Sequence, residues 1–306
     1  MRNRIALGRV SACLRWSGMG LLLGLAVPIV AAAQTGPAET RVPDRAFFVG
    51  AGVSYDWVNF SKQDIFGIGT SNVFRDGTLI TTGKAEGPGT VDLDSNSNPA
   101  PSVQVGYFQR FGDSDWLWGA KLAYSYVGTS STAHGILLPQ AGAFTVTATG
   151  ERIPFVGTAV ARSYEASVEH QITLAPIVGW SFLERSFVYV GGGPTLSRIQ
   201  TRVKSLVGFA DIRGVPTDVS GAPVDFSDAS WVWGGTATIG VTWFLTSSWF
   251  LDANYAYSRT SDYTSHYSKP FVNPNGANGL TTGTLVGTSS GNVTIHGITL
   301  TINRAF

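Results

Sequence analysis

The chain has 306 residues, enough for one large all-β domain or for two domains of ordinary size. Charged residues make up only 13 % of it, aromatic residues make up 12 %, and there are 37 glycines, a composition that argues against a disordered chain and against the well-solvated surface of a cytosolic protein. The formal net charge is +1, so no field strong enough to indicate a nucleic-acid partner is present.

Residues 1–33 have the layout of a secretory signal peptide. Positive charges come first, an uncharged apolar stretch follows, and the small residues 31–33 close it. We expect cleavage after Ala33 and a short periplasmic segment over residues 34–45; an uncleaved membrane anchor is the alternative. Cleavage would also remove the only cysteine, Cys13, which suits an oxidising compartment. Cleavage would remove four of the 21 basic residues and leave 17 against 20 acidic ones, so the net charge of the mature chain becomes −3. The four basic residues are Arg2, Arg4, Arg9 and Arg15.

Residues 46–306 alternate between apolar and small or polar side chains, which is the period of a β-strand. No uncharged apolar run there approaches 18 residues, so no helical membrane span is predicted. The alternating stretches are about ten residues or longer, the length of a strand that crosses a bilayer at a tilt. Their polar face is mostly Gly, Ser, Thr and Asn, as the inside of a narrow barrel requires. The eight stretches cover residues 47–57, 102–111, 116–126, 170–182, 187–198, 231–245, 249–258 and 293–306.

Short and long connections alternate strictly between these stretches. Three are tight turns, after Phe111, Phe182 and Leu245. Alternation places all long connections at one end, which is typical of outer-membrane barrels with short periplasmic turns and long extracellular loops. Aromatic residues beside the short turns predict a girdle at one membrane interface. The sequence therefore predicts an all-β, transmembrane, antiparallel up-and-down barrel of eight strands over residues 46–306, with four long extracellular loops at about residues 59–101, 130–164, 200–230 and 259–290.

The C-terminal stretch ends within a strand, which suits a last strand that pairs with the first and closes the barrel. Here the sequence resembles the small eight-stranded outer-membrane barrels of Gram-negative bacteria, such as the OmpA transmembrane domain, OmpX and OmpW. The resemblance implies that the barrel-assembly machinery reads the C-terminal strand. Arg304 departs from the family pattern, in which an aromatic residue is usual at that place. The residues that match the assembly signal are Ile298, Leu300, Ile302 and Phe306.

Four charged residues lie on the inward parity of their strands and are predicted to form a charge network in the lumen. Since eight strands leave a lumen that side chains can fill, we expect Arg110 and Lys121 to meet Asp252 or Asp56 as a plug, because buried charges need partners. A gated pore built from the same charges is the alternative. Within the network we predict that Arg110 pairs with Asp252 near the short-turn end.

The sequence contains no pattern that indicates catalysis, a cofactor or a metal site. The His266-Tyr267-Ser268 triplet matches the His-x-Ser pair of the lipid A deacylase PagL, but no carboxylate is placed to orient the histidine. His134 and His170 lack a second ligand at metal spacing. We therefore expect a non-enzymatic barrel in the cell outer membrane, with a structural or surface-interaction role; a narrow channel for small solutes and a lipid-modifying enzyme are the alternatives. Expected partners are outer-membrane lipid, lipopolysaccharide, the assembly machinery and an unidentified surface ligand.

Overall fold

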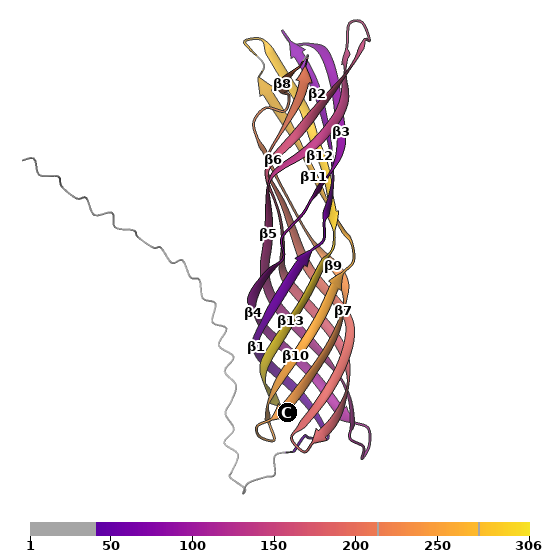
Figure 1. Ribbon diagram of the computed structural model, residues 1–306, viewed down its shortest axis with the longest axis vertical. Coiled ribbons are helices and arrows are strands. Elements are labelled where there is room, and N and C mark those ends of the chain that lie inside the picture. Colours follow the sequence, from indigo (N-terminus) through magenta and orange to yellow (C-terminus); the bar gives the residue numbers. More distant parts are fainter. Residues whose placement is uncertain (1–40, 213, 275) are drawn as a thin grey trace, which may run out of the picture. The chain divides into compact units, whose positions relative to one another are not determined.

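The computed structural model describes residues 41–212, 214–274 and 276–306, and nearly all of them lie in β-strands. The expected signal peptide of residues 1–33, and most of the expected periplasmic segment of residues 34–45, lie outside the described residues. No described helix is long and apolar enough to cross a membrane. The strands form one sheet that is wound into two stacked tiers, which we call the lower and the upper tier after their places in Figure 1.

The lower tier is a closed antiparallel ring of eight strands. Each strand is paired on both sides, so this ring has no free edge. The terminal strand pairs with the first, and Phe306 N donates to Phe47 O at 2.8 Å. The fold class predicted from the sequence is thus confirmed. In ring order the strands are β1 (Arg45–Phe60), β4 (Asn96–Arg110), β5 (Trp116–Val146), β6 (Arg152–Leu183), β7 (Ser186–Ile212), β9 (Val224–Phe244), β10 (Trp249–Thr260) and β13 (Val293–Ala305).

The upper tier is built from the segments that the sequence suggested were loops. The connections are long, as expected, but the structure folds them as strands. Four of the lower-tier strands, β5, β6, β7 and β9, continue upward, and two hairpins complete the ring. The ladders run in the order β11, β12, β2, β3, β5, β6, β7 and β9, with β8 added to β7. The added strands are β2 (Gln63–Arg75), β3 (Thr78–Val91), β8 (Val215–Asp218), β11 (Tyr263–Pro274) and β12 (Gly279–Gly291).

Side chains rather than a backbone ladder join β9 to β11, where the upper ring meets itself. His266 N donates to Asp228 Oδ2 at 3.2 Å, and Lys269 Nζ donates to Asp225 O at 3.0 Å. The junction between the tiers is marked on β5 by a register shift between Tyr126 and Thr129. Gly128 there has φ 58°, a left-handed conformation that glycine adopts without strain. A single strand can therefore serve both tiers by bulging where they meet.

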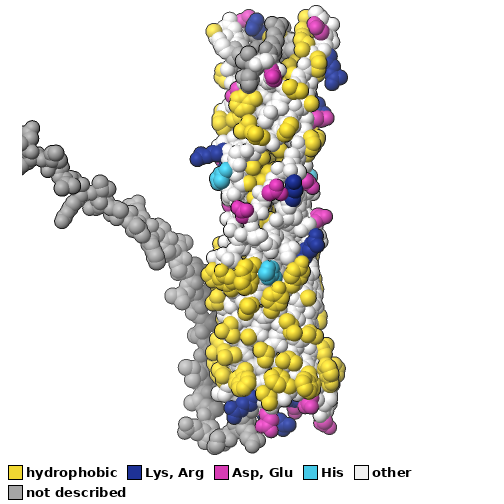
Figure 2. Space-filling view, viewed as in Figure 1, with side chains coloured by type: hydrophobic (Ala, Val, Ile, Leu, Met, Phe, Trp, Pro, Cys, Tyr) yellow, Lys and Arg dark blue, Asp and Glu magenta, His cyan; other side chains and the backbone are white. Residues whose placement is uncertain are grey.

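Apolar side chains form a belt on the face of the lower tier that Figure 2 shows, and exposed aromatic residues form a girdle at each end of this belt. The girdle beside the short turns was predicted; the second lies at the tier junction. The ten residues from Trp116 in the first girdle to Tyr126 in the second rise about 26 Å along the barrel axis, since the strand is tilted. This rise is close to the height of the apolar band of membrane barrels. The belt therefore fits one bilayer, with the upper tier outside it. Exposed girdle residues include Trp116, Trp118, Trp180 and Trp243 at one end, and Trp57, Tyr126, Trp231, Trp233 and Tyr257 at the other.

Candidate functional site

The lumen of the lower tier is filled by side chains. Next to the short turns an aromatic cluster closes it, with Phe48 edge-on to Phe250 at 5.3 Å between ring centroids and Phe244 stacked on Phe250 at 4.8 Å. At the tier junction a second apolar cluster closes it, with Val58, Val127 and Val293 fully buried. The polar layer between these clusters is consequently shielded from both ends.

Lys121 and Asp252 form a buried ion pair in this polar layer. Lys121 Nζ lies 2.9 Å from Asp252 Oδ1, and their side chains are 8 % and 3 % exposed. Tyr189 OH accepts from Lys121 Nζ at 2.7 Å and donates to Asp252 Oδ1 at 3.1 Å. Asn254 and Thr242 also donate to the carboxylate, at 2.9 and 3.3 Å. These hydrogen bonds compensate for the burial of the Asp252 carboxylate.

Two of the four predicted lumen charges therefore come together, and the other two do not join them. The predicted pair of Arg110 with Asp252 is wrong: Arg110 Nε lies 3.4 Å from Asp44, at the rim of the barrel, and its Nη1 lies 3.7 Å from Asp115. Asp56 accepts from Ser54 Oγ at 2.8 Å, higher in the lumen. Arg110 is the last residue of β4. Its guanidinium therefore lies close to the exposed carboxylates of Asp44, just before β1, and Asp115, just before β5.

Tyr189 was not predicted in the lumen, and Phe187 and Phe244, expected in the girdle beside the short turns, are also buried inside the barrel. Tyr189 lies in the glycine-rich stretch of β7, whose alternation is the least clear of the eight, so its facing could not be assigned. Gly240 lies opposite, and a Cβ placed there would be 2.4 Å from the Tyr189 ring. The inward tyrosine thus needs a glycine across the ladder, and that pairing is the signal that could have identified it.

A layer of tyrosines separates the two tiers, and we call it the tyrosine floor: Gln63, Tyr164, Thr201, Tyr263, Tyr267 and Ser289. Tyr263 OH donates to Gln63 Oε1 at 2.7 Å, and Tyr267 OH donates to Thr201 Oγ1 at 2.7 Å. Tyr164 OH forms a hydrogen bond with Ser289 Oγ at 2.5 Å. Burial raises the pKa of the Tyr164, Tyr263 and Tyr267 hydroxyls above the usual tyrosine value. The floor is therefore a neutral network whose hydrogen bonds are used internally.

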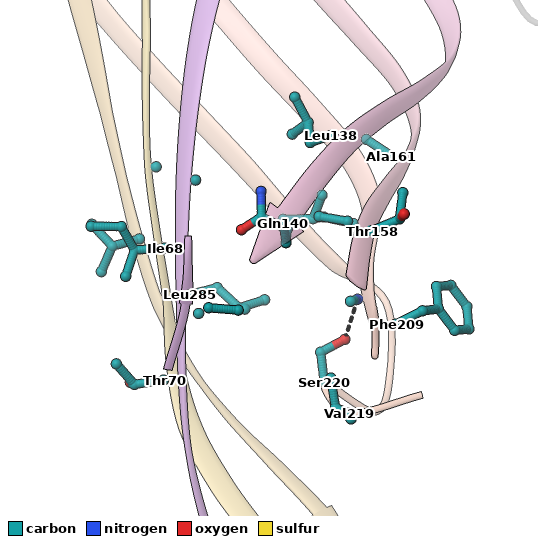
Figure 3. A pocket seen from close by; sticks show the side chains of 18 of the residues that line it. Ile68, Thr70, Leu138, Gln140, Thr158, Ala161, Phe209, Val219, Ser220 and Leu285 are labelled. Atoms are coloured by element: carbon teal, nitrogen blue, oxygen red, sulfur yellow. Dashed lines mark hydrogen bonds between the residues drawn. The ribbon is translucent and has the colours of Figure 1, made fainter. Parts of the chain in front are cut away.

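Above the tyrosine floor the upper tier surrounds a partly open apolar cavity of about 110 Å³ (Figure 3). It is lined by β2, β3, β5, β6, β7, β9, β11 and β12, with Leu138, Leu285 and Phe271 among the large side chains. Val219 and Ser220 close one side, where Gly208 N donates to Ser220 Oγ at 2.7 Å. Much of the wall consists of small residues, which include Gly67, Gly69, Gly83, Ala85, Ala159, Ala161, Gly208 and Gly287.

Gly67 and Gly69 of β2 differ from the glycines that face the filled lumen of the lower tier. In the lower tier a Cβ at Gly50 would lie 1.8 Å from Asn303 Oδ1, and one at Gly297 would lie 2.2 Å from Asp56 Oδ1, so these glycines make room for side chains that fill the lumen. In the upper tier a Cβ at Gly67 or Gly69 would find its nearest atom at 3.7 or 3.5 Å. There the space that glycine leaves stays open, and the cavity results.

The histidines lie on outer surfaces. His170 Nδ1 forms a hydrogen bond with Tyr124 OH at 2.9 Å, and the His170 ring stacks on Trp231 within the girdle at the tier junction. His296 stacks on Trp57 in the same girdle. His266 and Ser268 are exposed on β11, whereas Tyr267 between them is buried in the floor. Among the described residues no group of three or more His, Cys, Asp or Glu could hold a metal ion.

A closed antiparallel ring with an apolar belt and a filled lumen defines a membrane-type β-barrel. No protein-family model and no curated protein sequence matches the chain. Similar solved structures include the outer membrane protein OprG from Pseudomonas aeruginosa, at 11 % identity and TM-score 0.34, over 87 % of this chain and 97 % of that one. Ail, the attachment invasion locus protein of Yersinia pestis, has 12 % identity and TM-score 0.27, over 79 % and 98 %. The outer membrane protease OmpT from Escherichia coli has 9 % and 0.28, over 88 % and 99 %. With such low identities and TM-scores, the similarity does not extend to activity.

Proposed function

We propose that this chain is a non-conducting outer-membrane barrel with a structural and surface-interaction role, similar in kind to the OmpA transmembrane domain, OmpX and OmpW. The observation that carries the proposal is the continuity of β5, β6, β7 and β9 from the apolar belt into the upper tier. Strands that leave the membrane without interruption hold the upper tier as a rigid extension. The extension is suited to present a fixed surface away from the bilayer.

The filled lumen favours this role over the channel alternative. An ion on its way through the lower tier would have to displace the Phe48, Phe244 and Phe250 rings and then break the Lys121–Asp252 pair. A buried charge that is left without its partner costs about 3–5 kcal/mol, and the tyrosine floor is a further barrier. The wild-type barrel should therefore stay closed.

The upper tier is proposed to face the outside of the cell, with the short turns in the periplasm. Its outer surface carries ion pairs, such as Lys84 with Glu86 at 2.6 Å and Arg202 with Glu165 at 2.9 Å, which keep it hydrated. Lipid and lipopolysaccharide would contact the belt, the assembly machinery would read the strand that ends at Phe306, and a surface ligand would meet the upper tier. No catalytic role is proposed.

Amine labelling of intact cells tests the orientation, because the lysines are distributed unequally. Lys84 and Lys204 have side chains that are 59 % and 46 % exposed in the upper tier, whereas Lys121 is 8 % exposed in the lumen. A reagent that cannot cross the outer membrane should label Lys84 and Lys204 and leave Lys121 unmodified. Absence of label on intact cells, with labelling after lysis, would reverse the orientation.

Recordings in planar bilayers test the closed lumen. The wild-type barrel should show no reproducible unitary conductance, and liposomes that contain it should exclude small sugars and ions. A saturable wild-type conductance that changes in a Lys121→Met variant would support the channel alternative and make the buried pair a selectivity element.

A further inference from the structure

We propose that the cavity of the upper tier is a binding site for a small uncharged apolar molecule, of the size of one aromatic ring or a short alkyl chain. The inference goes beyond the surface role proposed above and does not depend on it. It rests on the volume, the lining and the position of the cavity.

The volume fits a ligand of that size. The cavity of about 110 Å³ is comparable to an engineered apolar cavity of about 150 Å³ that stays dry and takes up benzene. Its lining follows β2 from Ile65 to Ser71, a length of about 20 Å along a strand. A narrow and elongated space of this kind accepts a flat ring or an extended chain, whereas a branched or polycyclic molecule would require the walls to move.

The lining selects an apolar ligand. Small and apolar residues form most of the wall, and several of its polar groups already have partners in the protein. Tyr164 is hydrogen-bonded to Ser289, Tyr267 to Thr201, Ser220 to the Gly208 amide, Thr70 to Thr284 O and Gln140 to Gly87 O. A polar ligand group would find few free donors or acceptors and would pay for its desolvation. An apolar group gains by leaving water and loses no hydrogen bond.

The position identifies the ligand as a dissolved molecule rather than a lipid chain. On β5 the girdle at the tier junction contains Tyr126, whereas the cavity begins at Ile136. These residues of β5 are ten positions, or about 33 Å of strand, apart; on β9 the girdle residue Trp231 and the lining residue Phe226 are five positions, or about 17 Å, apart. The tyrosine floor closes the path through the lumen. An acyl chain of a membrane lipid would have to leave the bilayer to reach the site.

The glycine wall supplies a variant that fills the cavity without disturbing the backbone. A Cβ at Gly69 would lie 3.5 Å from Leu285 Cδ2, the end of a flexible side chain, and would meet nothing closer. Gly69→Leu should therefore occupy the space that the ligand would take. Asn72 lies on the exposed face of the same strand and does not line the cavity, so Asn72→Leu adds a similar apolar side chain outside it and serves as the matched control.

The test is a ¹⁹F NMR titration of the full-length barrel in lipid nanodiscs with fluorobenzene as the probe. Partition into lipid gives a linear background that is equal in all three proteins. We expect a saturable component in the wild type and in Asn72→Leu, and at least tenfold weaker binding in Gly69→Leu. No saturable component in the wild type, or an equal one in Gly69→Leu, would overturn the proposal.

Two further measurements keep the result decisive. If Gly69→Leu fails to fold, as judged by heat-modifiable migration, Gly67→Val replaces it, because a Cβ at Gly67 has its nearest atom at 3.7 Å. The titration is also repeated in discs of a lipid with shorter acyl chains. An unchanged saturable component supports a dissolved ligand, whereas a component that follows the chain length would identify the occupant as lipid and contradict the proposal.

Discussion

At the scale of single residues, the Lys121–Asp252 pair is the feature of the lumen with the largest consequences. Lys121→Met should destabilise the barrel by about 3–5 kcal/mol, since it leaves the Asp252 carboxylate buried without its cation. The double variant with Asp252→Leu should recover much of that loss. Equilibrium unfolding in urea of the wild type, the two single variants and the double variant measures the coupling. Simple additivity of the two single effects would show that the residues do not act as a pair.

Arg110→Met is the matched control for that cycle. The Arg110 side chain is only 11 % exposed, but its carboxylate partners Asp44 and Asp115 are 91 % and 70 % exposed, so water can solvate both carboxylates when the arginine is removed. The variant should therefore lose less stability than Lys121→Met does. An equal loss would mean that Asp44 and Asp115 depend on Arg110 as strongly as Asp252 depends on Lys121.

The tyrosine floor predicts a loss of stability at alkaline pH. Burial raises the pKa of Tyr164, whereas an unfolded tyrosine ionises near pH 10. Below pH 10 both states hold the proton and the free energy of unfolding is unaffected. Above it the unfolded state loses the proton first, so stability should fall by about 1.4 kcal/mol per pH unit for each such tyrosine.

Comparison of the wild type with Tyr164→Phe measures this effect. The variant should start from a lower stability, because Ser289 loses its partner, but it should show a shallower decline between pH 10 and pH 11. Urea unfolding at a series of pH values gives both slopes. Parallel slopes would indicate that Tyr164 ionises as freely in the folded barrel as in the unfolded chain.

At the scale of elements, the seam between β3 and β5 is a second weak part of the upper wall, beside the junction of β9 with β11. Their ladder runs from Thr81, opposite Val146, to Glu86, opposite Ala141, and stops there. Below it Pro88 and Pro139 lack the N–H group that a ladder needs, and contact continues through side chains, with Gln140 Nε2 donating to Gly87 O at 3.4 Å. Backbone pairing of β3 is thus complete along β2 and partial along β5.

Hydrogen exchange should reveal this seam. Amides of residues 87–91 that face β5 should exchange faster than those of residues 81–86, because no carbonyl of β5 protects them. Amides of the same strand that bond to β2 provide the internal control, since that ladder runs through to Val91. Uniform protection along β3 would show that the two strands are paired over their whole length.

The elements also show where sequence reasoning succeeds and where it stops. Strict alternation in stretches such as residues 249–258 identifies the lower-tier strands, because lipid outside and a filled lumen inside impose opposite demands on successive residues. In the upper tier both faces tolerate Gly, Ser and Thr: the outside meets water and the inside is an open cavity. Segments such as residues 63–75 therefore lack a clear period and resemble loops, although they are strands.

At the scale of the whole molecule, the same limit applies to the candidate sites. Strand parity places Lys121 and Asp252 in the lumen, but a choice between Lys121 and Arg110 as the partner requires the stagger of the closed ring, which no single strand encodes. The cavity could not be predicted either. It arises from eight strands that meet only after the hairpins β2–β3 and β11–β12 have completed the upper tier.

The two tiers should respond oppositely to a charge on their outer surface, which tests whether only the lower tier is in the membrane. Ile239 is 58 % exposed about midway between the girdle residues Trp233 and Trp243, and Val156 is 64 % exposed on the upper tier. Ile239→Arg should cost about 2–4 kcal/mol, as expected for arginine near the bilayer midplane. Val156→Arg should change the stability by no more than about 0.5 kcal/mol, because its side chain already faces water. Folding titrations into lipid vesicles measure both variants. An equal cost at the two positions would place the upper tier in lipid as well, and the belt would no longer mark the limits of the bilayer.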